Sequence, residues 1–457
     1  METNFSQRIA IFKRGDYFDN QKLTVIFTTV YTLSLLAFGM ILSKPLEILK
    51  GLSKIFNSPS HLITDYFALT NFGSVFINSG LLTLLSLIIA IRIKVPMDTK
   101  FVAAIFSVSG FSFFGKNLFN SLPIIIGIWL YSKAVNQPLN KHFNTALFGS
   151  SLSPVISYLA FGLKLPLAAG IFVGLIVGIL MGFFLPLLAD HFFHFHKGYN
   201  LYNVGFASGI ISMFIMGVLT IFGQTVETVN LISDTAQQPI LIFLIGLCLT
   251  MILVGALNYH IEVGKNQKVF DREKHHVAVG LINMGALGIF LIAYIILIGG
   301  DFNGPILGSI LTIIGFAPLG IRVNKAWPIL CGAFLAKLFG IVDIASCSAI
   351  MSALFALGLT PLSRRFGIFA GMIAGVLHIS IVGNIFFLHG GLNLYNNGFT
   401  CGFVAAFLLP IFEYLKTSQL FIKVARQGLT LQTTIKRIPG ELFKRLKINM
   451  NIKKRLS

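Results

Sequence analysis

The amino-acid sequence predicts an all-α polytopic membrane protein built from two inverted-topology repeats. Of its 457 residues, 55% are hydrophobic and 11% are charged, whereas about 25% of the residues of a soluble domain are charged. One polar motif occurs twice along the chain, and the basic loops change sides between its two copies. These three observations together predict the fold class.

Apolar segments follow one another along the whole chain, seven in each half. Crossing a ~30 Å hydrocarbon layer takes about 20 apolar residues in a helix. The segments are too long and too continuously apolar for barrel strands. We therefore expect helices, which satisfy all backbone hydrogen bonds within one segment in lipid. The expected helices cover residues 23–43, 72–91, 101–114, 118–133, 143–162, 165–189 and 201–222, then 239–257, 277–298, 306–319, 326–340, 344–358, 366–388 and 393–415.

The third segment of each half, 101–114 and 306–319, is too short for a full crossing. Each could be a half-helix or one arm of a re-entrant pair. If pieces of the third to fifth segments re-enter, the number of crossings falls from fourteen toward ten or twelve. The sequence therefore predicts 10 to 14 transmembrane segments, with short or re-entrant third segments.

The duplication is visible in two alignments of the chain with itself. His196 to Gly209 matches His389 to Gly402 at nine of fourteen positions, and Phe76 to Gly127 aligns with Leu281 to Gly332 without a gap. The shared positions include Asn, Pro and Gly, which chance similarity between apolar helices does not supply. Each half is therefore expected to be one structural unit, with the transport site of such proteins at the interface between the units.

The charges of the loops predict that the second half is inverted. Lys and Arg concentrate in cytoplasmic loops. The N-terminus and the loop at 92–100 are basic, whereas the matching stretches of the second half, 226–238 and 299–305, have no Lys or Arg. Both termini are then cytoplasmic, and the basic residues against this arrangement are Lys44, Lys50, Lys54, Lys116 and Lys164.

The domain organisation follows from this topology. The expected parts are a cytoplasmic N-terminus at 1–22, a first membrane repeat at 23–222, an extracytoplasmic linker at 223–238, a second membrane repeat at 239–415 and a basic cytoplasmic tail at 416–457. Residues 420–438 of the tail mix apolar and basic side chains. This stretch either lies on an anionic membrane surface or belongs to a solvated tail that only sets the topology.

Composition also argues against several partners. The net charge of +19 is spread over loops and the tail, so nucleic acid is not expected, and no cofactor motif is present. Four cysteines, Cys248, Cys331, Cys347 and Cys401, fall inside helices without paired spacing, as buried apolar residues do. His191, His194 and His196 are considered as metal ligands, but only Asp190 could add an oxygen, so no metal is expected.

The repeated motif supplies most of the candidate substrate-binding residues. Two Asn amides and a Tyr hydroxyl in each copy offer hydrogen-bond donors and acceptors without charge, which suits a neutral polar ligand. The alternative is that Asn and Tyr cap a helix at the membrane interface while Gly packs helices together. The candidates are Asn200, Tyr202 and Asn203 in the first copy and Asn393, Tyr395 and Asn396 in the second.

Asn78 and Asn283 are further candidates, because each lies among apolar residues within the second helix of its half. A buried amide in hydrocarbon must find a partner. Either it ties helices together or it lines a polar path across the bilayer. Pro123 and Pro328 each free a backbone carbonyl in the fourth helix, which could face a ligand or a neighbouring helix.

Ionisable residues within the spans are scarce, although ion-coupled carriers usually depend on them. We find only His378, Lys337, Asp343, Glu413 and Asp65 in or near spans, and none repeats between the halves. Solute flux without proton or sodium coupling is therefore expected. The opposing interpretation makes His378 a proton relay, because its charge changes near neutral pH.

The two copies of His-x-Gly-x-Asn-Leu-Tyr-Asn-x-Gly-Phe, with Gly115-Lys-Asn-Leu-Phe-Asn-Ser-Leu-Pro123-Ile, resemble a bacterial family of duplicated integral membrane proteins known as a domain of unknown function. The resemblance covers most of Leu23 to Tyr414 and implies a prokaryotic cytoplasmic membrane protein without assigning an activity. The architecture is also similar to inverted-repeat carriers of the uracil and anion-exchanger type, whose acidic substrate residues have no match here, and to urea channels.

These observations predict a transporter or channel for a small neutral polar solute, with its site between the repeats, in the bacterial cytoplasmic membrane. The alternative is a membrane-embedded enzyme or a structural membrane protein. An enzyme would concentrate reactive groups in one half, whereas the polar motif is shared by both. The expected partners are the lipid bilayer and the solute, and a homo-oligomer is left open.

Overall fold

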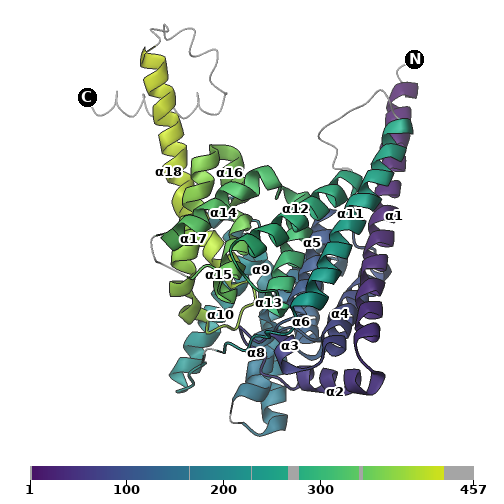
Figure 1. The fold of residues 1–457 in the computed structure, drawn as a ribbon, viewed down its shortest axis with the longest axis vertical. Helices are drawn as coiled ribbons and strands as arrows, with labels where there is room; N and C mark the ends of the chain where they lie inside the picture. Colours follow the sequence, from purple (N-terminus) through teal and green to yellow (C-terminus); the bar gives the residue numbers. More distant parts are fainter. Residues whose placement is uncertain (1–2, 164, 228, 266–276, 339–342, 427–457) are drawn as a thin grey trace. The chain divides into compact units, whose positions relative to one another are not determined.

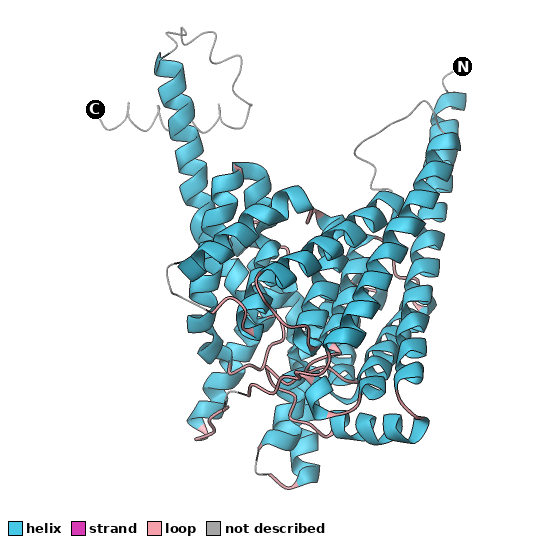
Figure 2. Cartoon of the chain, in the orientation of Figure 1, coloured by secondary structure: helices cyan, strands magenta, loops and turns pink. Residues whose placement is uncertain are grey.

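The structure is a computed structural model that describes residues 3–163, 165–227, 229–265, 277–338 and 343–426. The named elements of this described part are all helical, and two isolated β-bridges join loop segments. Figure 2 shows the helices in cyan, with loops gathered in the lower centre of the view. The all-helical prediction for a polytopic membrane protein is confirmed.

The chain divides into two compact units, the first ending at Ala406 and the second beginning at Phe407. The candidate residues of both halves lie in the first unit, and the helix that begins at Asn396 continues across the boundary into the second. The contacts described below are contacts within that unit.

In its described residues the first half contains ten α-helices, whose lengths range from four to forty residues. They are α1 (Thr3–Leu42), α2 (Pro45–Phe56), α3 (Tyr66–Leu69), α4 (Phe72–Arg92), α5 (Thr99–Phe111), α6 (Leu118–Ala134), α7 (Phe143–Gly149), α8 (Ser153–Ser157), α9 (Leu167–His196) and α10 (Asn203–Ile221). A tight turn at Ser150–Leu152 separates α7 from α8. In Figure 1, α1 runs from the N-terminal label down to α2 at the lower edge.

The second half repeats the order of the longer elements. Its helices are α11 (Gln237–Lys265), α12 (Val277–Leu297), α13 (Gly304–Phe316), α14 (Val323–Leu338), α15 (Cys347–Phe355), α16 (Thr360–Phe366), α17 (Ile368–His389) and α18 (Asn396–Arg426). A tight turn at Ala356–Leu359 separates α15 from α16, as Ser150–Leu152 separates α7 from α8.

Ten helical segments of the described residues are long and apolar enough to cross a membrane, five in each half. They are α1, α4, residues 143–162, α9, α10, α11, α12, residues 347–366, α17 and α18. The number of candidate spans in the described residues therefore equals the lowest of the predicted numbers of crossings. The third and fourth of the seven expected segments in each half form shorter helices.

In the first half these two short helices form a hairpin. The Asn140 side chain, after α6, donates a hydrogen bond of 3.3 Å to the Lys94 carbonyl, before α5. The outer ends of α5 and α6 therefore lie at the same end of the bundle, as they would in a re-entrant pair and in two consecutive crossings alike. With thirteen residues, α5 is about 20 Å long, which is shorter than a full crossing.

Helices α5 and α13 form the buried core of the first unit. All thirteen residues of α13 are buried, and so are residues 101–111 of α5. The two helices touch through backbone, since a side chain added at Gly110 would meet the Gly308 carbonyl oxygen, and one at Gly308 would meet that of Gly110. At the other end of the contact, Gly315 lies against Ala103 and Phe106. The pairing shows that the helices are antiparallel.

The linker between the halves pairs with the loop that follows α2. The Ile63 amide donates to the Val229 carbonyl at 2.7 Å, and the Leu231 amide donates back to the Ile63 carbonyl at 3.1 Å. Helix α1 therefore ends, through α2, on the side of the bundle where α11 begins. The extracytoplasmic location of the linker at 223–238 stays a prediction.

Candidate functional site

The two copies of the repeated motif bond to each other in a reciprocal way. The side-chain amide of Asn200 donates to the Gly398 carbonyl at 2.9 Å, and that of Asn393 donates to the Gly205 carbonyl at 3.4 Å. Each Asn also accepts the backbone N–H of the Tyr two residues later, at 2.9 Å and 3.0 Å. Both amides are thus occupied in joining one half of the chain to the other.

In each copy of the motif, the Leu that follows the first Asn bonds to the backbone of the opposite half. The Leu201 amide donates to the Gly358 carbonyl at 3.1 Å, and the Leu394 amide donates to the Ser151 carbonyl at 3.0 Å. Gly358 and Ser151 lie in the two tight turns that interrupt α15–α16 and α7–α8. A carbonyl left unpaired by each helix break is therefore satisfied by the motif of the other half.

The two motif tyrosines stack at the centre, with ring centroids 5.5 Å apart. Tyr395 meets Phe111 edge-on at 4.6 Å, and Tyr202 meets Phe316 in the same way at 4.8 Å. The Tyr395 hydroxyl bonds the Ser107 hydroxyl at 2.8 Å. The Tyr202 hydroxyl is buried and has no hydrogen-bond partner among the described residues.

The remaining motif amides hold the end of the preceding helix. Asn203 bonds the His196 ring at 3.0 Å through its side-chain oxygen and donates to the Ala189 carbonyl at 2.9 Å. Asn396 makes the matching bond to the His389 ring at 2.5 Å. All six motif candidates therefore lie at the contact between the halves or directly beside it. Their contacts are internal, and their role toward a solute stays a prediction.

Asn78 and Asn283 occupy equivalent places at the ends of the two central helices. The Asn78 side chain donates to the Ser112 and Lys116 carbonyls at 2.8 Å and 2.9 Å. The Asn283 side chain donates to the Ala317 and Ile321 carbonyls at 3.1 Å and 3.0 Å. Each amide ties the second helix of its half to the C-terminal end of the short third helix.

A buried lysine that the sequence reasoning missed lies in the turn between α5 and α6. Lys116 is 1% exposed, and its ammonium donates to the Ser150 hydroxyl, at the break between α7 and α8. Asn120 supports the same turn by donating to the Gly115 carbonyl and the Ser157 hydroxyl. The available signal was the failure of Lys116 to fit the charge pattern of the loops.

Several buried polar atoms on elements that pack around the turn holding Ser150 have no hydrogen-bond partner among the described residues. They are the side-chain oxygens of Asn144 and Ser151, on α7 and the following turn, and of Ser208 and Ser212 on α10. Buried hydroxyls are normally satisfied by protein or by ordered water, so ordered water is expected at these positions.

Asp65, the residue that caps the short helix α3, is a buried carboxylate. It accepts the backbone N–H groups of Phe67, Ser233 and Gly304 at 2.9, 3.0 and 3.2 Å. These donors belong to the first half, to the linker and to the first residue of α13. Asp65 therefore joins three separate parts of the chain.

The other ionisable candidates are scattered. His378 is buried, and its ring bonds the Asn397 carbonyl at 3.3 Å. Asp343 is exposed and accepts the Ala345 amide at 3.2 Å. The side chain of Lys337 and the tail beyond Arg426 lie outside the described residues. In the described part of the chain, no three His, Cys, Asp or Glu side chains are grouped to hold a metal ion.

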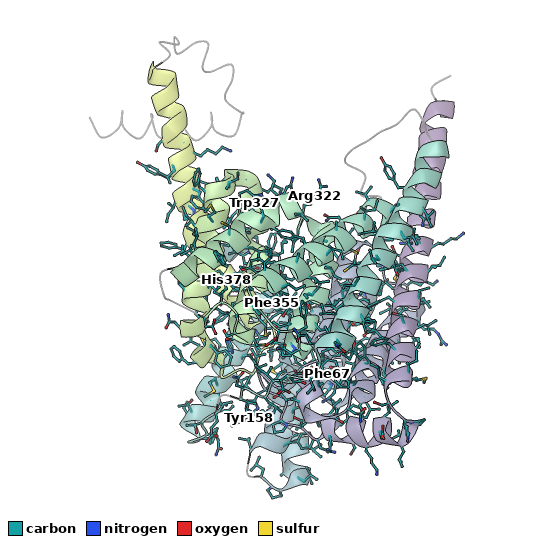
Figure 3. The ribbon with its side chains drawn as sticks, in the orientation of Figure 1. Phe67, Tyr158, Arg322, Trp327, Phe355 and His378 are labelled. Atoms are coloured by element: carbon teal, nitrogen blue, oxygen red, sulfur yellow. The ribbon has the colours of Figure 1, made fainter. Side chains whose placement is uncertain are left out.

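Figure 3 shows how these regions are distributed along the bundle. Arg322 and Trp327 lie toward its upper end, Phe67 and Tyr158 toward its lower end, and Phe355 and His378 between them. Ten candidate spans among the described residues and two halves joined by reciprocal contacts define the class: a polytopic helical membrane protein with an internal duplication.

Comparison with known proteins identifies the family. The model of a family described as "Protein of unknown function (DUF1576)" matches residues 44–221 and 272–414, which together make up most of the chain. The protein belongs to this family, as the resemblance of its motifs predicted. No curated protein and no solved structure matches the chain.

Proposed function

We propose that the protein is a membrane transporter or channel for a small polar solute, with its site between the two halves. The observation that carries this proposal is the reciprocal contact at the centre, where Asn200 and Asn393 each bond the opposite copy. Related halves that meet at the middle of a bundle are typical of secondary transporters. The unpartnered polar atoms on α7, on the turn after it and on α10, drawn from the described residues, support a polar environment beside this contact.

We further propose that the two halves are inverted repeats. The antiparallel contact of α5 with α13 supports this arrangement. The repeat offset of 205 residues relates Gly110 to Gly315 and Ala103 to Gly308, and Gly110 contacts Gly308 just as Gly315 contacts Ala103. The position of the linker supports it too, since α1 ends on the side where α11 begins. With five spans in each half, the second half then starts on the opposite side from the first.

The distribution of charge supports a bacterial cytoplasmic membrane with both termini inside. In the first half the loops at 92–100 and 133–141 carry exposed basic residues, and in the second half Arg322, Arg364 and Arg365 do so. Positive loops face the cytoplasm, so these loops and the ends of the chain are proposed to lie there. The exposed lysines on and before α2, Lys44, Lys50 and Lys54, do not follow this pattern.

The expectation of a neutral solute rested on the motif amides. Their bonds to backbone and to histidine rings mean that they are already paired within the protein. The hydroxyls of Ser151, Ser208 and Ser212 offer a polar lining instead. Hydroxyl groups bind charged and neutral solutes alike, so the proposed function is the transport of a small polar solute.

A membrane-embedded enzyme is the second candidate, and one observation favours it. The Lys116 ammonium bonds the Ser150 hydroxyl in a buried place, and a lysine can act as the base of a nucleophilic serine. Covalent labelling of Ser150 by a fluorophosphonate, lost in Ser150→Ala, would support hydrolysis. Absence of labelling in folded protein would remove this alternative.

Flux into proteoliposomes tests the transport proposal. Purified protein should admit at least one of radiolabelled urea, glycerol, alanine, succinate or phosphate faster than protein-free liposomes. Ser212→Leu should reduce this flux because it replaces a buried hydroxyl with an apolar side chain, whereas Phe214→Leu, at a 68% exposed side chain on the same helix, should not. Equal flux with and without protein for every solute would contradict the proposal.

A further inference from the structure

The turns that follow α5 and α13 align with each other in the repeat, and each contains a glycine with positive φ. Gly115 and Gly320, 205 positions apart, both have positive φ, +88° and +121°. Each turn precedes a helix with an internal proline, Pro123 in α6 and Pro328 in α14. They therefore mark matching places in the two halves.

These turns lie toward opposite ends of the bundle. The first touches the end of α2, because the Asn117 side chain donates to the Ile55 carbonyl at 3.1 Å. The second carries Arg322, which lies toward the upper end of the view in Figure 3, far from the lower edge where Figure 1 places α2. The axis of the bundle therefore has one such turn near each end.

Both turns carry basic residues. In the first, this residue is the buried Lys116. In the second, Arg322 and Lys325 are joined by Arg364 of α16, whose guanidinium lies so near the turn that a side chain on Gly320 would meet it at 3.3 Å. A solute moving between the two ends would meet basic side chains near both.

Lys116 is suited to bind an anion. Its ammonium has three N–H donors and bonds one neutral hydroxyl, that of Ser150. No carboxylate of the described residues pairs with it, and the oxygens of Asp65 are bonded to backbone N–H groups. A buried cation is stabilised by an opposite charge far more than by a hydroxyl.

Neighbouring hydroxyls complete the environment. Ser151 follows the residue that Lys116 bonds, and its hydroxyl is buried without a partner in the described residues. Ser208 and Ser212 lie on α10, which packs against this turn, and their hydroxyls are also buried without a partner in the described residues. Hydroxyl donors beside an ammonium suit the oxygens of a carboxylate or a phosphate.

We propose that the transported solute is a small oxyanion, a carboxylate or a phosphate, and that Lys116 binds it inside the bundle while Arg322, Lys325 and Arg364 attract it at the other end. This inference rests on the proposed transport function and specifies its substrate class. It replaces the neutral solute expected from the motif amides.

The test compares Lys116→Met with Lys133→Met, a control at an exposed lysine. Wild-type protein and the control should take up radiolabelled succinate or phosphate in proteoliposomes and should gain thermal stability in detergent with the same anion, beyond a chloride control. Uptake by Lys116→Met should be at least about tenfold lower, because the charge-assisted bond between Lys116 and the anion is removed. The arm that responds, succinate or phosphate, identifies the oxyanion.

Other outcomes separate the two proposals. If urea or glycerol enters through wild type and Lys116→Met alike while neither oxyanion does, the solute is neutral and only this inference fails. If no solute enters faster than into protein-free liposomes, both proposals fail. Should Lys116→Met not fold, Arg364→Gln at its exposed position gives the second reading, and unchanged oxyanion uptake by that variant would overturn the inference.

Discussion

Asn78 and Asn283 illustrate how single side chains hold the centre of this protein. Each amide donates to two carbonyls at or beyond the C-terminal end of a short helix, where the helix itself leaves carbonyls unpaired. Of the two roles considered for them, the tie between helices is the one for which the structure shows contacts.

Replacement of Asn78 by Leu should therefore lower the stability of the fold. The Ser112 and Lys116 carbonyls would lose a donor in a buried place, at a cost of about 1–3 kcal/mol. Thermal unfolding in detergent measures the loss. Asn384→Leu is the control, since Asn384 is exposed and bonds its own helix. Lost transport with unchanged unfolding would instead make Asn78 a residue of the solute path.

Asp65, which lies outside the spanning segments, should make stability depend on pH. Burial raises the pKa of its carboxyl from 3.8 to about 6, and the backbone donors Ser233, Phe67 and Gly304 oppose this rise. Because the folded pKa is the higher one, the contribution of Asp65 is fully present below about pH 4 and is lost as the pH rises through about 6.

The melting temperature of the wild type should accordingly fall between about pH 4 and pH 6 relative to that of Asp65→Asn, and the difference should level off above about pH 7. Asp98→Asn, at an exposed helix cap, is the control and should follow the wild-type slope. Parallel curves for wild type and Asp65→Asn would show that this carboxyl does not titrate in that range.

Among the helices, α5 and α13 make the closest backbone contact between the two halves. They touch where Gly110 and Gly308 oppose each other, and neither position has room for a side chain. Small residues permit such close approach in membrane proteins. The contact places two short helices against each other's backbone.

Gly110→Ala should destabilise the protein, although Ala favours a helix by about 1 kcal/mol over Gly. The added methyl group meets the Gly308 carbonyl oxygen, and overpacking costs about 1–3 kcal/mol. Gly246→Ala is the control, because nothing lies within 4 Å of the added atom in α11. The melting temperature should fall for the first variant and stay level or rise for the second; the same response in both would remove the packing argument.

Across the full chain, the proposed inversion puts equivalent loops on opposite sides of the membrane. Pro96 and Asp301, 205 positions apart, are both exposed and lie in matching loops before α5 and α13. If the halves were parallel, these two positions would share a side.

Cysteine labelling tests this arrangement after Cys248, Cys331, Cys347 and Cys401 are replaced. A membrane-impermeant maleimide applied to intact cells should label Asp301→Cys and should reach Pro96→Cys only after permeabilisation. Asn136→Cys, exposed after α6, should behave like Pro96→Cys. Labelling of both equivalent positions from the same side would contradict the inverted repeat.

Part of the candidate site was predictable before the structure, and part was not. The duplication and the apolar spans depend on local composition, so they could be recognised directly. The role of Lys116 could not, because a lysine between two apolar segments looks like a loop residue until packing shows that it is buried. The role of the motif amides toward a solute stays a prediction. The partners of Asn200 and Asn393 lie 198 and 188 residues away, in the other copy, and only the folded chain reveals them.

Composition and self-similarity were enough to predict an all-helical membrane protein with an internal duplication, because burial in lipid requires long apolar helices and a repeat is visible as identity. That five segments in each half of the described chain, and not seven, form helices long and apolar enough to be candidate spans became apparent only in the folded structure. Apolarity measures how much of a segment is buried but not where the chain ends its helix. Helices α5 and α13 each end after thirteen residues, at Phe111 and Phe316, and are therefore too short for a full crossing.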